Sequence, residues 1–141
     1  LTRSHLKGDP FTSKSLKALE EYIEDQVEPL ARSLATFEKD VAAGTSKTFR
    51  TLAKLAQNLH PKLGAHLTLD ALDQLVPEIQ GLDLEKRIEL PGVSTERAHQ
   101  LVAGSMVARQ LMRTLNLKEI RICPWALREG IVLHRLDWIE R

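Results

Sequence analysis

The sequence predicts a mostly helical α/β chain that folds as a single domain over residues 1–141, with five or six helices and two short strands. Three observations predict this class. The chain has 141 residues, of which 43% are apolar, and this is enough for one buried core but not for two. Apolar residues recur at spacings of three and four along most of the chain, which is typical of helices with one buried face. Two short segments, 41–43 and 118–123, have the apolar or alternating pattern of a strand.

The first part of the chain predicts an arm, a long helix and a strand. Residues 1–13 are polar and contain a glycine and a proline, so we expect a loop or an extended arm. A helix begins near Lys14, and Pro29 should kink or break it, because proline removes a backbone hydrogen bond. Residues 41–43 follow as a short buried strand that ends at Gly44. The apolar face of the helix is formed by Leu16, Leu19, Tyr22, Ile23, Val27, Leu30, Leu34 and Phe37.

Two capped helices are expected next. Thr45 or Ser46 can cap a helix over residues 47–58, because a hydroxyl oxygen accepts a hydrogen bond from the free N–H groups of a helix start. Thr68 can cap the following helix in the same way, and Gly81 marks its end. The apolar stripes of these two helices are Phe49, Leu52, Ala53, Leu55 and Ala56, and Leu69, Leu72, Leu75 and Val76.

The last part of the chain predicts three helices and a strand. A short helix over 83–90 leads to a long helix over 95–115, which Ser94 can cap. Residues 118–123 alternate as a strand, and a last helix follows over 124–137. Two separated strands do not make a stable sheet, and the sequence does not begin with methionine, so we expect a piece of a longer protein. One narrow face of the long helix carries Ala98, Leu101, Val102, Ser105, Ala108, Met112 and Leu115.

Charge and composition exclude several classes of protein. There are 20 Lys and Arg residues against 19 Asp and Glu, which argues against a disordered tail and a strongly basic nucleic-acid-binding protein. Aromatic residues make up 4% of the chain, so few side chains could stack on bases. No apolar stretch approaches the roughly 20 residues of a membrane span, and we see no secretory signal. A single cysteine, Cys123, excludes an internal disulfide or a multi-cysteine zinc site and favours a cytoplasmic location.

The clearest candidate site is a phosphate-binding turn formed by Gly44, Thr45, Ser46, Lys47 and Thr48. A strand runs into a tight turn there, and a helix begins. The N–H groups of a helix start have no internal acceptor, and the helix dipole favours an anion. The hydroxyls add donors, the lysine adds a positive charge, and the glycine permits close backbone approach. The stretch lacks the longer glycine pattern of a Walker loop, so an ordinary capped helix is the alternative.

Other polar residues are weaker candidates. Arg97 can fork onto phosphate oxygens, or it can be a surface arginine paired with Glu96 or another acid. Arg128 and Glu129 can be functional or can form a structural ion pair, which we prefer, and Gly130 inside a helix suggests close packing. The five histidines show no metal-ligand spacing with acids or cysteines. We find no complete catalytic set and no metal site in the sequence.

Four stretches, taken together and in order, resemble the Ppx/GppA family of exopolyphosphatases and guanosine-pentaphosphate phosphohydrolases. They are residues 44–49, 90–94, 96–98 leading to 103–104, and 126–130. The resemblance covers essentially the whole chain and also includes Asp9-Pro10. It implies a partial ribonuclease H-like fold of the actin-like ATPase superfamily, with this chain as the later part of the second domain. The family usually reads Gly-Thr-Ser-Gly-Thr at the turn, and here Lys47 replaces the second glycine.

The resemblance also implies a function for the intact protein. It would release terminal phosphate from inorganic polyphosphate, with a divalent metal, magnesium or manganese, as cofactor. This part would form one wall of the cleft, with Gly44, Thr45, Ser46, Lys47 and Arg97 at the phosphate. The family's catalytic glutamate and glycine-rich loop are not in this sequence, so we assign no catalytic residue and expect the 141 residues alone to be inactive. A guanosine-pentaphosphate phosphohydrolase and a non-enzymatic helical interaction or dimerisation domain stay open, and open strand edges favour a homodimer.

Overall fold

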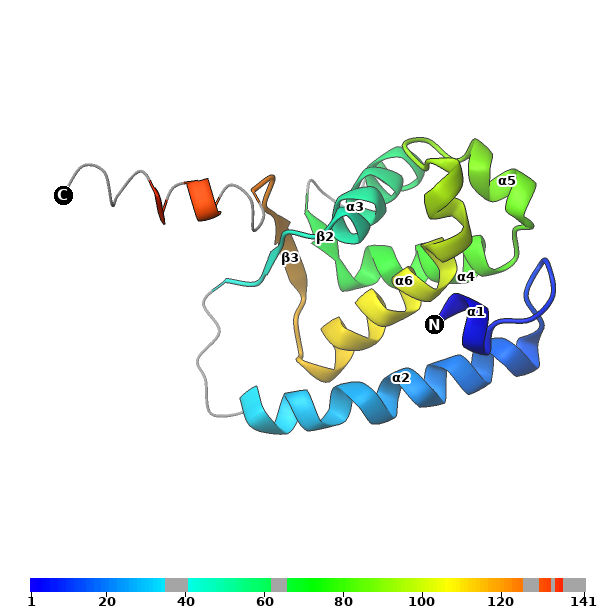
Figure 1. Cartoon of the computed structure of the whole chain (residues 1–141), viewed down its shortest axis with the longest axis horizontal. Helices are drawn as coiled ribbons and strands as arrows, with labels where there is room; N and C mark the ends of the chain where they lie inside the picture. Colours follow the sequence, from blue (N-terminus) through cyan, green and yellow to red (C-terminus); the bar gives the residue numbers. More distant parts are fainter. Residues whose placement is uncertain (35–40, 62–65, 126–129, 133, 136–141) are drawn as a thin grey trace.

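The computed structural model describes residues 1–34, 41–61, 66–125, 130–132 and 134–135. It shows packed helices with a small sheet at one side of them (Figure 1), so the predicted class is confirmed. None of the described helices is long and apolar enough to cross a membrane. In chain order the elements are α1 (Thr2–His5), α2 (Ser13–Leu34), β1 (Ala43–Gly44), α3 (Lys47–Leu59), β2 (Leu67–Thr68), α4 (Leu69–Gln80), α5 (Leu84–Glu89), α6 (Thr95–Thr114) and β3 (Glu119–Ile122).

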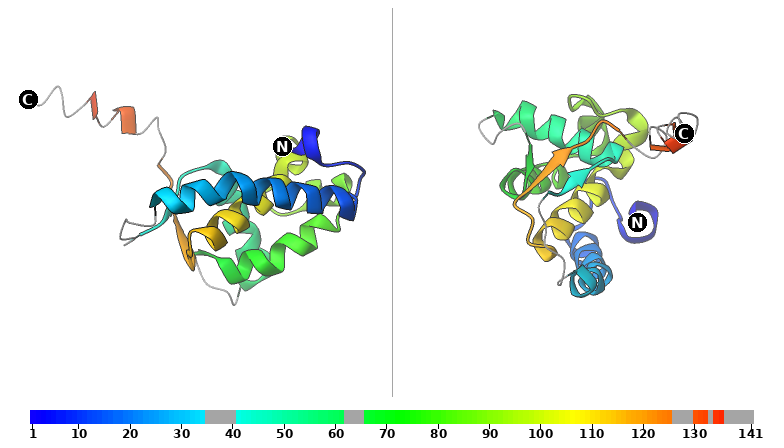
Figure 2. Two further views of the ribbon diagram at one scale, coloured as in Figure 1. Left: turned by 90° about the horizontal axis from the view of Figure 1, so that it is seen from below. Right: turned by 90° about the vertical axis from the view of Figure 1, so that its left-hand side faces the viewer.

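Helix α6 lies at the centre of the packed helices and contacts α1, α2, α3, α4 and α5. Its partner α2 runs alongside it, as the views of Figures 1 and 2 agree. The predicted face of α6 is buried at six of its seven residues, but the buried surface is wider than predicted, because Ala103 and Met106 are buried as well. The small residues of α6 let the neighbouring helices approach closely. The buried residues of α6 are Ala98, Leu101, Val102, Ala103, Ser105, Met106, Ala108 and Met112.

The sheet has three strands in the order β1-β3-β2. Strand β1 is parallel to β3, with Gly44 opposite Ile122, and β2 is antiparallel to β3, with Leu67 opposite Ile120. The sequence prediction of two strands missed β2. The predicted buried strand at 41–43 is also wrong in its position, because the buried residue of β1 is Gly44 and Val41 is 58% exposed. Within the described residues β1 has a partner on one side alone, which leaves its other edge open.

The predicted helix caps place the ends of the helices. The Phe49 amide donates to Ser46 Oγ at 3.2 Å, and the Ala71 amide donates to Thr68 Oγ1 at 3.1 Å. Ser94 occupies the cap position of α6, but its side chain makes no capping hydrogen bond. Of the two outcomes predicted for Pro29, a break is contradicted, because α2 continues through it to Leu34. Pro29 is exposed, so water can solvate the carbonyl that the proline leaves unbonded.

The N-terminal arm is more ordered than a loop. Residues 2–5 form the short helix α1, and Leu6 is buried in the core. Thr12 N–H donates to the Lys7 carbonyl at 2.9 Å and closes the turn that follows. Leu6 is one apolar residue in a polar stretch, so no period marks it as a core residue. The prediction of an extended arm or loop is therefore wrong for residues 2–5.

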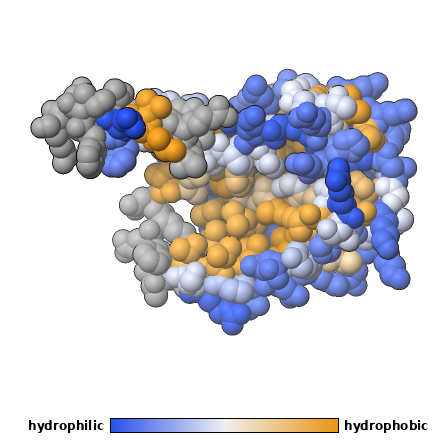
Figure 3. Space-filling view, in the orientation of Figure 1, coloured by the Kyte–Doolittle hydropathy of each residue, from blue (hydrophilic) through white to orange (hydrophobic). Residues whose placement is uncertain are grey.

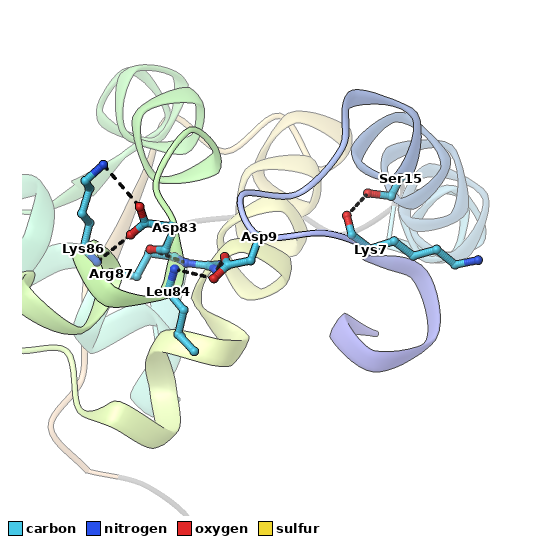
Figure 4. A network of polar contacts seen from close by, with 7 residues as sticks. All are labelled: Lys7, Asp9, Ser15, Asp83, Leu84, Lys86 and Arg87. Atoms are coloured by element: carbon cyan, nitrogen blue, oxygen red, sulfur yellow. Dashed lines mark hydrogen bonds and ion pairs between the residues drawn. The ribbon is translucent and has the colours of Figure 1, made fainter.

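An ion pair that we call the clasp, between Asp9 and Arg87, fastens this arm to α5 (Figure 4). The Arg87 side chain is 2% exposed and lies over the Phe11 ring, with its guanidinium carbon 4.5 Å from the ring centroid. The second carboxylate oxygen of Asp9 accepts a hydrogen bond from the Leu84 amide at 2.9 Å. One carboxylate thus neutralises a buried cation and satisfies a free N–H at the start of α5. Asp83 caps the same helix by accepting from the Lys86 amide at 2.9 Å.

Two expectations for the C-terminal part are corrected. Cys123, expected to be a buried strand residue, follows β3 and is half-buried. A Cβ placed on Gly130 would meet no described atom within 4 Å, so the close packing expected of this glycine is absent from the described part of the chain. Half of the last helix, expected over 124–137, lies outside the described residues, including Arg128 and Glu129, and the described residues 130–132 and 134–135 are helical.

The core is one cluster of apolar side chains supplied by α2, α3, α4, α6 and the sheet. Figure 3 shows that apolar residues also gather on the surface between α2 and β3. Leu30 and Leu34 of α2 are 48% and 38% exposed. The helices therefore cover the core on most sides and leave part of the apolar surface open near the uncovered edge of β1.

Candidate phosphate-binding site

The predicted turn lies where β1 passes into α3, and packing explains its glycine. A Cβ on Gly44 would lie 2.9 Å from Ile120 Cγ2 and 3.0 Å from Phe49 Cβ. Real Cβ atoms do not approach other atoms so closely without something shifting. The close approach that the glycine permits is thus to side chains of β3 and α3. It sets the path of the chain into the helix start.

The first turn of α3 presents free hydrogen-bond donors. Ser46 Oγ accepts from the Phe49 amide, and the Ser46 carbonyl accepts from the Arg50 amide at 3.2 Å. A hydroxyl that accepts one bond can still donate its own proton. The amides of Lys47 and Thr48 are the first two of the helix and have no acceptor within it. Thr45, Ser46 and Lys47 are exposed, so a positively polarised helix end lies open to solvent with a cation beside it.

Arg97 lies against this helix start. Together with Thr48, Thr51, Gln100 and Leu101 it lines a small hollow of about 20 Å³, which is room for about one water molecule. Arg97 is half-buried, and it makes no ion pair within 4.0 Å with a carboxylate of the described residues. The alternative of an arginine paired with a neighbouring acid is therefore contradicted there. The structure brings Arg97 next to Thr48, the residue that follows Lys47.

Helices α3 and α6 meet at this place because α6 carries a glycine. A Cβ on Gly104 would lie 2.9 Å from Thr48 Cγ2. The side chain of Thr48 therefore lies directly over the backbone of α6. Segments that are about 50 residues apart in the sequence are held together by this contact, and the five predicted site residues come from both of them.

A larger cleft of about 1110 Å³ lies between α1 and α6, and Thr48 lines it as well. Sequence reasoning named Thr48, Glu96 and residues 103–104 separately but did not predict that they lie beside the N-terminal arm. Arg3 is exposed on α1, and no local pattern in a polar arm indicates that it faces α6. The cleft is lined by Leu1, Thr2, Arg3, Ser4, Thr48, Glu96, His99, Gln100, Ala103 and Gly104.

A metal site does not emerge from the described residues. No group of three or more His, Cys, Asp or Glu side chains lies close enough together there to hold an ion. The candidate site consists of amides, hydroxyls and cations, which are donors to an anion and poor ligands for a divalent cation. We therefore assign no metal ligand in this part of the chain.

Solved structures define the class of protein. The crystal structure of the Aquifex aeolicus member of the Ppx/GppA family matches with a TM-score of 0.84 at 23% identity, over 99% of this chain and 46% of that chain. The crystal structure of an exopolyphosphatase from Cytophaga hutchinsonii ATCC 33406 matches with a TM-score of 0.80 at 22% identity, over 96% and 45%. These matches show the fold, which is the actin-like, ribonuclease H-like fold predicted from the resemblance.

The sequence itself then places the chain. Residues 1–138 match the model of the Ppx/GppA phosphatase family, and the chain belongs to that family. Exopolyphosphatase 1 of Mycobacterium leprae (strain TN) is 39% identical over 142 residues, which cover 97% of this chain and 42% of the relative. Exopolyphosphatase 1 of Mycobacterium tuberculosis (strain ATCC 25618 / H37Rv) is 40% identical over 97% of this chain and 41% of its own length. The chain thus spans about two fifths of the curated relatives that it matches.

Proposed function

We propose that the whole protein is an exopolyphosphatase that releases the terminal phosphate of inorganic polyphosphate. The chain described here forms one phosphate-binding wall of its cleft, in the later part of the second domain. The observation that carries the proposal is the exposed start of α3, with free amides, the hydroxyls of Thr45 and Ser46, and Lys47. Arg97 adds a second cation that no described carboxylate neutralises. The two mycobacterial relatives, which are named exopolyphosphatases, support the choice of substrate.

Binding and charge stabilisation are the work of these residues in the proposed reaction. Water attacks the terminal phosphorus, the bridging P–O bond breaks, and the leaving oxygen keeps the electron pair. Phosphoryl transfer is catalysed mainly by positioning and electrostatic stabilisation. The amides of Lys47 and Thr48 and the hydroxyl of Ser46 hold phosphate oxygens, while Lys47 and Arg97 offset their negative charge. A general base and the ligands of the divalent cation, magnesium or manganese, belong to the rest of the protein in this proposal.

The test is phosphate release by the purified full-length protein with magnesium or manganese. Polyphosphate should be a better substrate than guanosine pentaphosphate, judged by kcat/KM, and the 141 residues alone should release no phosphate above a heat-killed control. The variant Lys47→Ala should lower kcat/KM about tenfold, because a contact between a cation and a phosphate oxygen is lost. Lys17→Ala is the matched control, since Lys17 is an exposed lysine of α2 that lies 3.9 Å from Glu21.

Three results would contradict this proposal. Equal loss in the two lysine variants would remove the turn from the phosphate site. A higher kcat/KM for guanosine pentaphosphate would make the protein a guanosine-pentaphosphate phosphohydrolase. Absence of hydrolysis of both substrates would favour the non-enzymatic interaction domain. We further propose a homodimer and a cytoplasmic location, which gel filtration with light scattering and cell fractionation would test.

A further inference from the structure

Helix α3 carries a line of three cations. The proposed terminal-phosphate site uses only the first of them. Lys47, Arg50 and Lys54 are spaced by three and four residues, so they lie along one face of the helix. We call these three residues the basic row. Residues 41–69 contain no Asp or Glu, although the chain as a whole has 19 acids in 141 residues. The segment that contains α3 therefore carries only positive formal charges, in a chain with a formal net charge of +1.

The basic row also lacks the ion pairs that other helices make. Within the described residues none of its three cations lies within 4.0 Å of a carboxylate, and Arg50 donates one hydrogen bond, to the Pro124 carbonyl at 3.5 Å. Lys47 and Lys54 are exposed, and Arg50 is half-buried. Six other basic side chains of the described residues do pair with acids, in Lys17–Glu21, Arg32–Glu28, Lys86–Asp83, Arg87–Asp9, Arg109–Glu20 and Arg113–Asp73.

The length of the basic row decides what it can bind. Seven residues at about 1.5 Å of rise separate Lys47 from Lys54 by about 10 Å. A single phosphate held at the start of α3 therefore reaches Lys47 and not Lys54. The far end of the row adjoins the turn that leads into α6, because the Lys54 side chain passes 3.6 Å from the position of a Cβ on Gly92. An anion that spans the row must be extended and must carry charge along its length.

We propose that the basic row binds inner phosphates of a linear polyphosphate chain whose terminal phosphate lies at the start of α3. This inference rests on the proposed function and extends it to Arg50 and Lys54. A linear polyphosphate carries a negative charge on every unit and has no bases or sugars to recognise. Helix α3 itself offers charge without an exposed aromatic platform, since Phe49 is half-buried. An exposed aromatic side chain, Trp125, is next in the sequence to the Pro124 that Arg50 contacts. A single-stranded nucleic acid would be expected to use such platforms.

The KM of the full-length protein for polyphosphates of different chain length distinguishes binding by the basic row from binding at the terminal-phosphate site. Lys54→Ala should raise KM for long-chain polyphosphate by about two- to fivefold, the range for one exposed charge contact, and leave kcat unchanged. It should leave KM for tripolyphosphate unchanged, because that substrate ends before Lys54. The slope of log KM against log salt for the long chain should become shallower by about one. Lys17→Ala should change none of these values.

Different results would refute the basic row and the terminal-phosphate site. An equal effect of Lys54→Ala on long and short substrates, or an effect on neither, would overturn the role of the basic row. If Lys47→Ala leaves kcat/KM unchanged for both long-chain polyphosphate and tripolyphosphate, the proposed terminal-phosphate site is refuted. This result does not depend on Lys54. Binding of labelled long-chain polyphosphate, measured by competition, gives a readout without turnover. If a single-stranded oligonucleotide of equal charge displaces it as well as unlabelled polyphosphate does, recognition of polyphosphate by the row is refuted.

Discussion

Replacing Asp9 by asparagine should destabilise the chain far more than its exposed position suggests. The Asp9 side chain is 43% exposed, but its partner Arg87 is 2% exposed. The variant keeps an oxygen that can accept the hydrogen bond from the Leu84 amide, so mainly the charge is lost. Arg87 then remains a buried cation, and its Nη1 atom already lacks a hydrogen-bond partner among the described residues.

The two limits of ion-pair energetics bracket the expected loss. Exposed pairs contribute up to about 1 kcal/mol, and removal of one partner from a buried pair costs about 3–5 kcal/mol. One buried and one half-exposed partner place the clasp between these limits, at about 2–3 kcal/mol of unfolding free energy. The matched control is Asp73→Asn, because the Asp73–Arg113 pair is 38% and 43% exposed. We expect the control to lose no more than about 1 kcal/mol.

Urea unfolding of the 141-residue chain, followed by far-ultraviolet circular dichroism, measures both values. The midpoint should fall clearly further for Asp9→Asn than for Asp73→Asn, with similar slopes. Arg87→Met, which removes the buried charge itself, should recover part of the loss when it is added to Asp9→Asn. Equal losses in the two asparagine variants would refute the reasoning, because they would show that the burial of Arg87 adds nothing to the cost of breaking its pair.

Three further predictions concern the turn, the start of α5 and the sheet edge. Gly44→Ala should cost about 1–3 kcal/mol of unfolding free energy, because its Cβ has no room beside Ile120 and Phe49; a urea midpoint equal to that of the wild type would contradict it. The pKa of Asp83 lies below its ordinary value because its carboxylate accepts a hydrogen bond from the Lys86 amide, so its stabilising effect is full above about pH 4 and fades as the pH falls through the lowered pKa. Asp83→Asn should therefore weaken the acid dependence of unfolding, and an unchanged pH profile would count against the cap. The open edge of β1 should make the 141-residue chain self-associate, whereas a mass near 15.9 kDa by light scattering at every concentration over a tenfold range would reject this.

Local features of the fold could be predicted from the sequence, and long-range features could not. The caps at Ser46 and Thr68 were predicted correctly because a cap depends on residues three positions apart. Strand β2 was missed because two residues, Leu67–Thr68, are too few to show a period. The continuity of α2 was missed because Pro29 disrupts a helix less when its unbonded carbonyl faces water. Strand β1 begins two residues later and ends one residue later than the predicted strand over 41–43, because its burial is set by contact with β3.

In the candidate site, too, local features could be predicted from the sequence and long-range features could not. The start of α3 could be recognised because its glycine, hydroxyls and lysine are adjacent in the sequence. The surroundings of Arg97 could not, because pairing depends on which distant carboxylates come within reach. The clasp joins residues 78 positions apart, and no local pattern of Asp9 or Arg87 indicates it. The spacing of the three cations in the basic row is visible in the sequence. Whether distant carboxylates pair with them depends on the folded chain.

Titration of the 141-residue chain with pyrophosphate, followed by amide chemical shifts, tests the central claim most directly. The account predicts that the shifts centre on residues 44–48 at the start of α3 and extend to Arg97. It also predicts that Lys47→Ala reduces these shifts, while Lys17→Ala leaves them unchanged. Shifts centred on another part of the chain, or equal shifts in the wild type and in Lys47→Ala, would contradict the claim that this turn binds phosphate.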